Sequence, residues 1–121
     1  MLTGTIHEKG AKGEEIALNY LLNKGYLLIQ KNYRIKGGEI DLIVSDHQTL
    51  IMVEVRMRQK MMDAAESIIP LKCRRLTKTA QNFIMQHQEV VSKFPFMRFD
   101  VILINKNGEI HHIENAFGAE S

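Results

Sequence analysis

The sequence predicts an α/β or α+β layer fold, because two helical patterns and five strand-like runs follow one another in the order αβββαββ. Apolar residues recur with helical spacing in two long segments and form short runs elsewhere. Short breaks rich in glycine, asparagine and aspartate separate the strand-like runs. The chain of 121 residues suits one domain that is long enough to bury its own core.

The first predicted helix covers residues 10–24, and Gly25 is a good residue to end it. On a helical wheel one apolar stripe contains Ile16, Ala17, Tyr20 and Leu21. Glu14 falls at the edge of this stripe, whereas Glu15 falls well away from it. We therefore expect Glu14 to reach a neighbouring sheet and Glu15 to face solvent.

Three strand-like runs follow, at residues 26–34, 39–45 and 50–56. The breaks between them are short and turn-like, Lys36-Gly37-Gly38 and Asp46-His47-Gln48, and therefore predict an antiparallel meander. Two more strands are predicted at 98–104 and 109–115, where Asn107-Gly108 is a strong hairpin signal.

The second predicted helix lies between these groups of strands, at residues 68–88, with Ser67 as its candidate cap and Pro70 in its first turn. Six residues share the face expected to meet the core: Cys73, Leu76, Ala80, Phe83, Ile84 and His87. Lys72, Arg75 and Thr79 are expected on another face. The linker at 57–66 is expected to be irregular and to form a mobile loop beside the site.

The composition indicates a soluble globular protein, with an apolar share of 45% and a charged share of 25%. No apolar run approaches the roughly 18 residues that a membrane-spanning helix needs, and the N-terminus lacks an apolar signal region. We therefore expect a cytoplasmic protein with no membrane partner, whose ends, at 1–9 and 118–121, are flexible. Cys73 is the only cysteine, which excludes an internal disulfide and a cysteine-rich zinc site.

Basic residues concentrate between positions 56 and 78, where seven of the 16 lysines and arginines fall and only Asp63 and Glu66 oppose them. The seven are Arg56, Arg58, Lys60, Lys72, Arg74, Arg75 and Lys78. Such a cluster is either a phosphate-binding surface or a solvated helix face. The formal net charge of +2 is too small to decide between these alternatives.

Asp41 and Glu54 are nearly symmetric about the turn at 46–48, so antiparallel pairing places them roughly opposite each other with Cβ atoms about 5 Å apart. Two carboxylates this close repel, and Mg²⁺ or Mn²⁺ between them removes the repulsion. Glu39 shares the Asp41 face and is a further candidate ligand. Arg56 lies on the Glu54 face, where it can bind a phosphate oxygen. The alternative is a structural ion pair of Arg56 with Glu54 or Asp41.

Six blocks of the sequence, spread in order over about residues 10–117, resemble the YraN family of uncharacterised bacterial proteins. They are GAKGEEIALNYLLNKGY, KNYRIKGGEIDLI, VEVRMR, LKCRRL, RFDVILI and HIENAF. That family resembles restriction-endonuclease-like nucleases, and among them the archaeal Holliday-junction resolvases. The resemblance implies a mixed central sheet flanked by helices and a PD-(D/E)-x-K site. In that site Asp41 corresponds to the aspartate, Glu54 to the acidic metal ligand and Glu14 to an added helix glutamate.

The resemblance further implies an endonuclease that depends on Mg²⁺ or Mn²⁺ and acts on structured or branched DNA. By analogy with resolvases, it also implies a homodimer. Asp41, Glu54 and the backbone carbonyl of Val55 are expected to hold the metal. Glu14 is expected to act through a water or a second metal, and Arg56 to stabilise the phosphate. Nucleic-acid contacts are expected from Arg58, Lys72 and Arg75.

One departure from the family pattern falls at Arg56, where the family usually has a lysine. Arginine supplies charge and hydrogen-bond donors, but it cannot lose a proton at any working pH. Either Arg56 serves as a fixed cation and the chain cleaves, or the chain binds nucleic acid without cutting it. A third possibility is an interaction protein with no nucleic-acid role. Lys72 can replace the missing lysine or bind a substrate phosphate.

Two other groups of polar residues are set apart from this site. Asp100, at the start of a predicted core strand, is expected to be a structural hydrogen-bonding residue. His111 and His112 are adjacent on a predicted strand, so they point to opposite faces and cannot jointly hold a metal.

Overall fold

The computed structural model describes residues 6–117, with side chains from residue 10 onward. The helices and strands, in chain order, are α1 (Ile6–Asn23), β1 (Leu27–Ile35), β2 (Gly38–Ser45), β3 (Thr49–Met57), α2 (Met61–Glu66), α3 (Pro70–Gln86), α4 (Gln88–Val91), β4 (Phe96–Ile104) and β5 (Ile110–Phe117). The expectation of flexible ends concerns residues 1–5 and 118–121, which lie outside the described part, and residues 6–9, which belong to α1.

The strands form one mixed sheet in the order β1-β2-β3-β4-β5. β1, β2 and β3 are an antiparallel meander, β3 and β4 pair in parallel, and β4 and β5 are again antiparallel. Gly37 lies in the two-residue turn between β1 and β2 with a φ of 89°, a conformation that glycine adopts without strain. The predicted meander and the predicted mixed sheet flanked by helices are confirmed.

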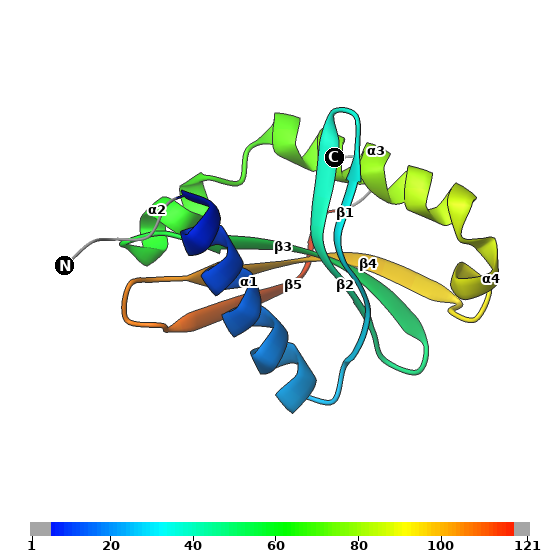
Figure 1. Cartoon of the computed structure of the whole chain (residues 1–121), viewed down its shortest axis with the longest axis horizontal. Helices are drawn as coiled ribbons and strands as arrows, with labels where there is room; N and C mark the ends of the chain where they lie inside the picture. The colour runs from blue at the N-terminus through cyan, green and yellow to red at the C-terminus, as the bar shows by residue number, and fades with distance from the viewer. Residues whose placement is uncertain (1–5, 118–121) are drawn as a thin grey trace.

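Helices cover both faces of the sheet (Figure 1). On one face Ala17 and Leu21 of α1 pack against alternate residues of β2, β3 and β4, such as Val53 and Ile102. On the other face Leu76, Ala80 and Phe83 of α3 pack against the intervening strand residues. The alternation of apolar residues along the central strands therefore supplies buried apolar packing on both faces of the sheet.

The segment after β3 differs from the expected irregular linker, because residues 61–66 form the short helix α2. Its Ala64 is fully buried against Val101 and Leu103 of β4. Ser67 does not cap the next helix, since its hydroxyl donates to the carbonyl of Ala64 at 2.6 Å and so closes α2. The helix that follows begins at Pro70, ends at Gln86 and is separated from the short helix α4.

Thr79 is the one residue of α3 whose predicted face is wrong, because its side chain is fully buried. The β1–β2 hairpin extends past β3 and lies over α3, so that a Cβ atom on Gly38 would overlap Thr79 Oγ1 and lie 3.2 Å from the carbonyl of Arg75. Only a glycine allows the hairpin to approach the helix this closely. The contact fixes α3 against β2 on one side of the candidate site.

Candidate metal and nucleic-acid site

The site begins where β2 and β3 stop pairing. The last register pair of the two strands is Leu42 with Val53, and Asp41 and Glu54 are the next residues on each strand. Beyond this point the Val55 amide donates to Asp41 Oδ2 at 2.8 Å. Val55 is therefore tied to Asp41 through its N–H group, and its carbonyl is its only atom able to bind a metal.

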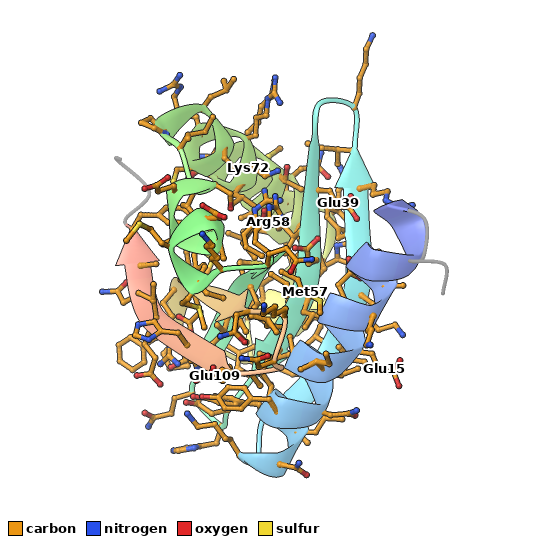
Figure 2. All side chains as sticks on the ribbon, turned by 90° about the vertical axis from the view of Figure 1, so that its left-hand side faces the viewer. Glu15, Glu39, Met57, Arg58, Lys72 and Glu109 are labelled. Carbon is orange, nitrogen blue, oxygen red and sulfur yellow. The ribbon has the colours of Figure 1, made fainter. Side chains whose placement is uncertain are left out.

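Glu14 reaches the same region from α1, because that helix lies very close to β3 at the preceding residue. A Cβ atom on Gly13 would lie 3.2 Å from Met57 Cβ and 3.7 Å from a methyl group of Val55. The next residue, Glu14, is half-buried, whereas Glu15 is exposed on the outer side of the helix (Figure 2). The distinction between the two glutamates is thus borne out by their burial.

Three carboxylates meet at this point, from Glu14, Glu39 and Asp41. One oxygen from each lies within 4.8 Å of the others, an arrangement that can hold a metal ion. With its amide oriented so that the nitrogen faces the acids, Asn32 donates to Glu14 Oε1 at 2.8 Å and to Glu39 Oε1 at 3.2 Å. Asn32 has a φ of 51°, a left-handed conformation that asparagine tolerates better than most residues.

Crowding of the acids changes their protonation. Burial, and then the charges of Asp41 and Glu39, raises the pKa of Glu14 to about 6. Burial and the nearby Asp41 also raise the pKa of Glu54 well above its usual range, although Arg56 opposes this shift. Excess negative charge of this kind is relieved by a proton or by a cation.

Glu54 points toward two cations on the other side of the site. Arg56 Nη2 contacts Glu54 Oε2, and Lys72 Nζ from α3 lies 3.7 Å from the same oxygen. The Arg56 side chain is only 14% exposed, and the contact with Glu54 is not aligned as a hydrogen bond. Its Nε atom has neither a hydrogen-bond acceptor nor an ion-pair contact among the described residues, so this buried guanidinium keeps an unpaired donor.

All of these acids except Glu14, together with both cations, line one open pocket of about 580 Å³. Its wall consists of Arg34, Ile35, Gly37, Gly38, Glu39, Asp41, Glu54, Arg56, Lys72, Arg75 and Leu76. In Figure 2, Lys72 and Arg58 lie to the left of Glu39, and all three labelled residues are near one another in this view. Arg58 is exposed outside the pocket lining, and its Nη1 donates to the carbonyl of Met57 at 2.8 Å.

The structure therefore brings together Glu14, Asp41, Glu54, Arg56, Val55, Lys72 and Arg75, and places Arg58 nearby. Two further residues belong to the site. Glu39, which strand alternation offered only as a spare ligand, is part of the three-acid group. Asn32 carries no signal in the sequence, because its role depends on a bent backbone conformation that brings it to the two glutamates.

A separate polar cluster surrounds Asp100, which is 1% exposed. Asp100 accepts hydrogen bonds from Arg98 Nε at 2.9 Å and from the backbone N–H of Asn115 at 3.0 Å. It also pairs with His112 Nε2 at 2.7 Å. Burial alone would raise the pKa of Asp100, but these hydrogen bonds outweigh it and lower the pKa. This pattern matches the structural role expected of Asp100. His111 is exposed while His112 is half-buried, as expected for opposite strand faces.

The fold and the pocket define a mixed α/β protein with carboxylates and cations gathered where two strands of its sheet diverge. The chain belongs to the family described as "Uncharacterised protein family UPF0102", which matches residues 13–104. The resemblance to the YraN family, which is this family, is thereby confirmed.

Relatives within the family match nearly end to end. The chain is 44% identical to a UPF0102 protein from Nitrosomonas eutropha over 111 residues, which are 90% of this chain and 92% of the relative. It is 42% identical to a UPF0102 protein from Ralstonia pickettii over 118 residues, 93% and 91% of the two chains. A UPF0102 protein from Persephonella marina is 40% identical over 111 residues, 90% and 92% of the chains. Within the described residues, no helix is long and apolar enough to cross a membrane.

Proposed function

We propose that this protein is a cytoplasmic, divalent-metal-dependent endonuclease of restriction-endonuclease-like fold that cuts structured or branched DNA. The observation that carries the proposal is the meeting of Glu14, Glu39 and Asp41 within 4.8 Å, beside a pocket that also holds Glu54 and Arg56. The acids suit a hard metal ion, and the cations suit a phosphate.

The donor set fits Mg²⁺ or Mn²⁺, because every candidate side-chain ligand offers an oxygen atom. Asp41 and Glu54, with the carbonyl of Val55, are the ligands that the motif implies. Glu14 and Glu39 each bring one carboxylate oxygen within 4.8 Å of Asp41 and would bind through a water or a second ion. A bound metal would supply a water of lowered pKa and positive charge at the phosphate.

The cations of the pocket have different capacities. Arg56 is buried with an unpaired Nε donor and would hold a non-bridging phosphate oxygen through a charge-assisted hydrogen bond. Lys72 is the one lysine in the pocket lining, and unlike arginine its amine can exchange a proton. We assign to Lys72 the positioning of the attacking water, the task that the family lysine would otherwise perform. Arg58 and Arg75 would contact the DNA backbone outside the reacting phosphate.

A cleavage assay on a four-way junction, a flap and a single strand, each with Mg²⁺ and with Mn²⁺, tests the proposal. Asp41→Ala and Glu54→Ala should abolish cleavage while DNA binding largely survives, since the cations remain. Glu15→Ala is the matched control, because Glu15 is exposed beside Glu14 and should leave cleavage unchanged. Cleavage that persists in both acid variants would overturn the proposal.

A second candidate function is nucleic-acid binding without catalysis. The contacts of Glu54 with Arg56 and Lys72 favour it, because two protein cations already lie against the Oε2 atom that a metal would need. If the wild-type chain binds DNA and does not cut it, Arg56→Lys is the informative variant. Gain of cleavage in that variant would identify a disabled nuclease.

The oligomeric state bears on both candidates. A four-way junction presents two symmetric cuts, so we propose that two copies of the chain act together. Light scattering on the protein with and without junction DNA tests this. A gel-shift titration at two salt concentrations separates both candidates from an interaction protein with no nucleic-acid role, which would show no salt-dependent binding.

A further inference from the structure

Three consecutive apolar residues, Ile69, Pro70 and Leu71, are exposed immediately before the pocket residue Lys72. Ile69 is 49% exposed and Leu71 is 43% exposed. Apolar residues close to this triplet are packed, since Ile68 contacts the cluster around Ala64 and Cys73, two residues after Leu71, is buried. We call these three residues the apolar tip.

The backbone holds the apolar tip in place. The Cys73 amide donates to the carbonyl of Ile69 at 3.1 Å, and Pro70 is the first residue of α3. Proline at this position fixes its own φ at a helical value. A ligand that meets a pre-ordered surface loses little free energy to ordering it.

The surroundings of the apolar tip are basic. Lys72 reaches to within 3.7 Å of Glu54 in the pocket, and Leu71 shares a helical face with Arg75, which also lines the pocket. Arg74 and Lys78 are exposed further along α3, and the helix contains no acidic residue. The ligand of this surface must therefore present apolar area directly beside negative charge.

A nucleic acid with exposed bases meets both requirements, because each base face is apolar and each phosphate is charged. Continuous duplex meets only the second, since its base faces are covered by stacking. Isoleucine, leucine and proline are among the residues that proteins insert between base steps. Unstacking costs least where the stack is already interrupted, so an inserted side chain favours such places.

We propose that Ile69, Pro70 and Leu71 form a wedge that contacts unstacked bases next to the phosphate held in the pocket, and so selects branched or frayed DNA over continuous duplex. This inference rests on the proposed function, because the pocket must seat a DNA phosphate. The feature of the substrate that the wedge recognises is a break in base stacking.

The test uses a synthetic four-way junction carrying the fluorescent base 2-aminopurine at its branch point, and a continuous duplex with the same base in its middle. The full chain is titrated into each in EDTA, so that binding is measured without cleavage. We expect 2-aminopurine fluorescence to rise on binding to the junction, and the junction to be bound more tightly than the duplex. Ile69→Ser/Leu71→Ser should lose the rise and weaken junction binding about tenfold, with little change for the duplex.

Met85→Ser is the matched control, because Met85 is 69% exposed on the same helix but lies near its other end, away from the pocket lining. It should behave as wild type in both titrations. The single variants Ile69→Ser and Leu71→Ser should each show part of the loss, and thermal melts should confirm that every variant is folded.

The outcomes separate the wedge from the nuclease. A double variant that matches wild type on the junction overturns the wedge and leaves the proposed function intact. Wild-type protein that binds neither DNA at low salt overturns both. A double variant that keeps its DNA binding but loses binding to vesicles of phosphatidylglycerol assigns the apolar tip to a membrane surface and overturns the wedge.

Discussion

Asp41 accepts a hydrogen bond from the backbone amide of Val55, with 2.8 Å between Oδ2 and the nitrogen. The bond joins β2 to β3 just past the last pair of the strand register. Asp41 therefore has two roles. One oxygen accepts a hydrogen bond that joins two strands, and the negative charge is part of the acidic group with Glu14 and Glu39. Substitutions at Asp41 can separate these two roles.

Asp41→Asn should retain the hydrogen bond and remove the charge. We expect metal-dependent cleavage to fall by about 100-fold or more, with unfolding free energy nearly unchanged. Asp41→Ala should lose cleavage and also about 1–3 kcal/mol of stability, because the Val55 amide is left without its acceptor. Cleavage rates and urea unfolding of both variants measure the difference. Equal stability of the two variants would show that the bond contributes nothing.

The pKa of Glu14, about 6 in the folded protein against an ordinary value of 4.5, predicts a pH-dependent stability. The folded state binds the Glu14 proton more tightly than the unfolded state does. The stabilisation from this proton is therefore fully present below about pH 4.5, and it is lost as the pH rises through 6. In EDTA, Glu14→Gln should therefore lose less stability than wild type between pH 5 and pH 7.5. Glu15→Gln, at an exposed position, should follow wild type.

The same titration should govern metal binding, because a carboxylate must be deprotonated to act as a ligand. We expect the affinity of wild-type protein for Mn²⁺ to increase as the pH rises through about 6, measured by calorimetry. An affinity that is flat between pH 5 and pH 7.5 would exclude Glu14 from the metal site.

Gly38→Ala should destabilise the protein by about 1–3 kcal/mol, because its Cβ atom would overlap the buried Thr79 Oγ1. Thr79→Ala removes that oxygen, so the double variant should recover much of the loss. Chemical unfolding of the two single variants and the double variant gives the coupling energy. Strictly additive effects would mean that the hairpin and α3 do not meet at these two residues.

Asp100→Asn should cost about 3–5 kcal/mol, because it leaves Arg98 without its buried carboxylate partner. The lowered pKa of Asp100 stabilises the fold above an ordinary value of 3.8, and this contribution is lost as the pH falls through the folded value. The variant should therefore unfold with a weaker pH dependence in acid than wild type. An unfolding midpoint equal to that of wild type would contradict the structural role.

Arg75→Ala should weaken DNA binding by a similar factor for all sequences and reduce the slope of log affinity against log salt by about one. Arg75 is exposed at the pocket edge, so its loss should leave the fold unchanged. Lys106→Ala, in the exposed turn between β4 and β5, is the charge-matched control. An equal change in slope for both variants would mean that binding follows total charge and not this surface.

Local sequence patterns predict most of this architecture, because the strands are short apolar runs bounded by turn residues. Gly25, for example, ends α1 with a φ of 95°, as its position in the sequence implies. Helical periodicity also separates Glu14 from Glu15, since the orientation of a side chain on a helix depends only on spacing.

Features that depend on distant contacts are not predictable in this way. The helix α2 owes its stability to Ala64 packing on β4, about 40 residues further along the chain. Thr79 is buried because the β1–β2 hairpin reaches over α3, a consequence of how far two strands extend beyond the third. The contact of Asn32 with the acids likewise requires a left-handed residue within a strand.

The chain leaves the pocket after Arg56, near the end of β3, and returns to it at Lys72 in the connection to β4. The acids come from α1, β2 and β3, whereas the apolar tip and most of the basic residues belong to this connection. Under the proposed function, the carboxylates that would hold the metal and the surface that would select the substrate are therefore encoded in different stretches of the gene. Under the same proposal, we expect mutations within residues 59–71 to change which DNA is bound while the carboxylates stay in place, so this stretch is the one to exchange between relatives.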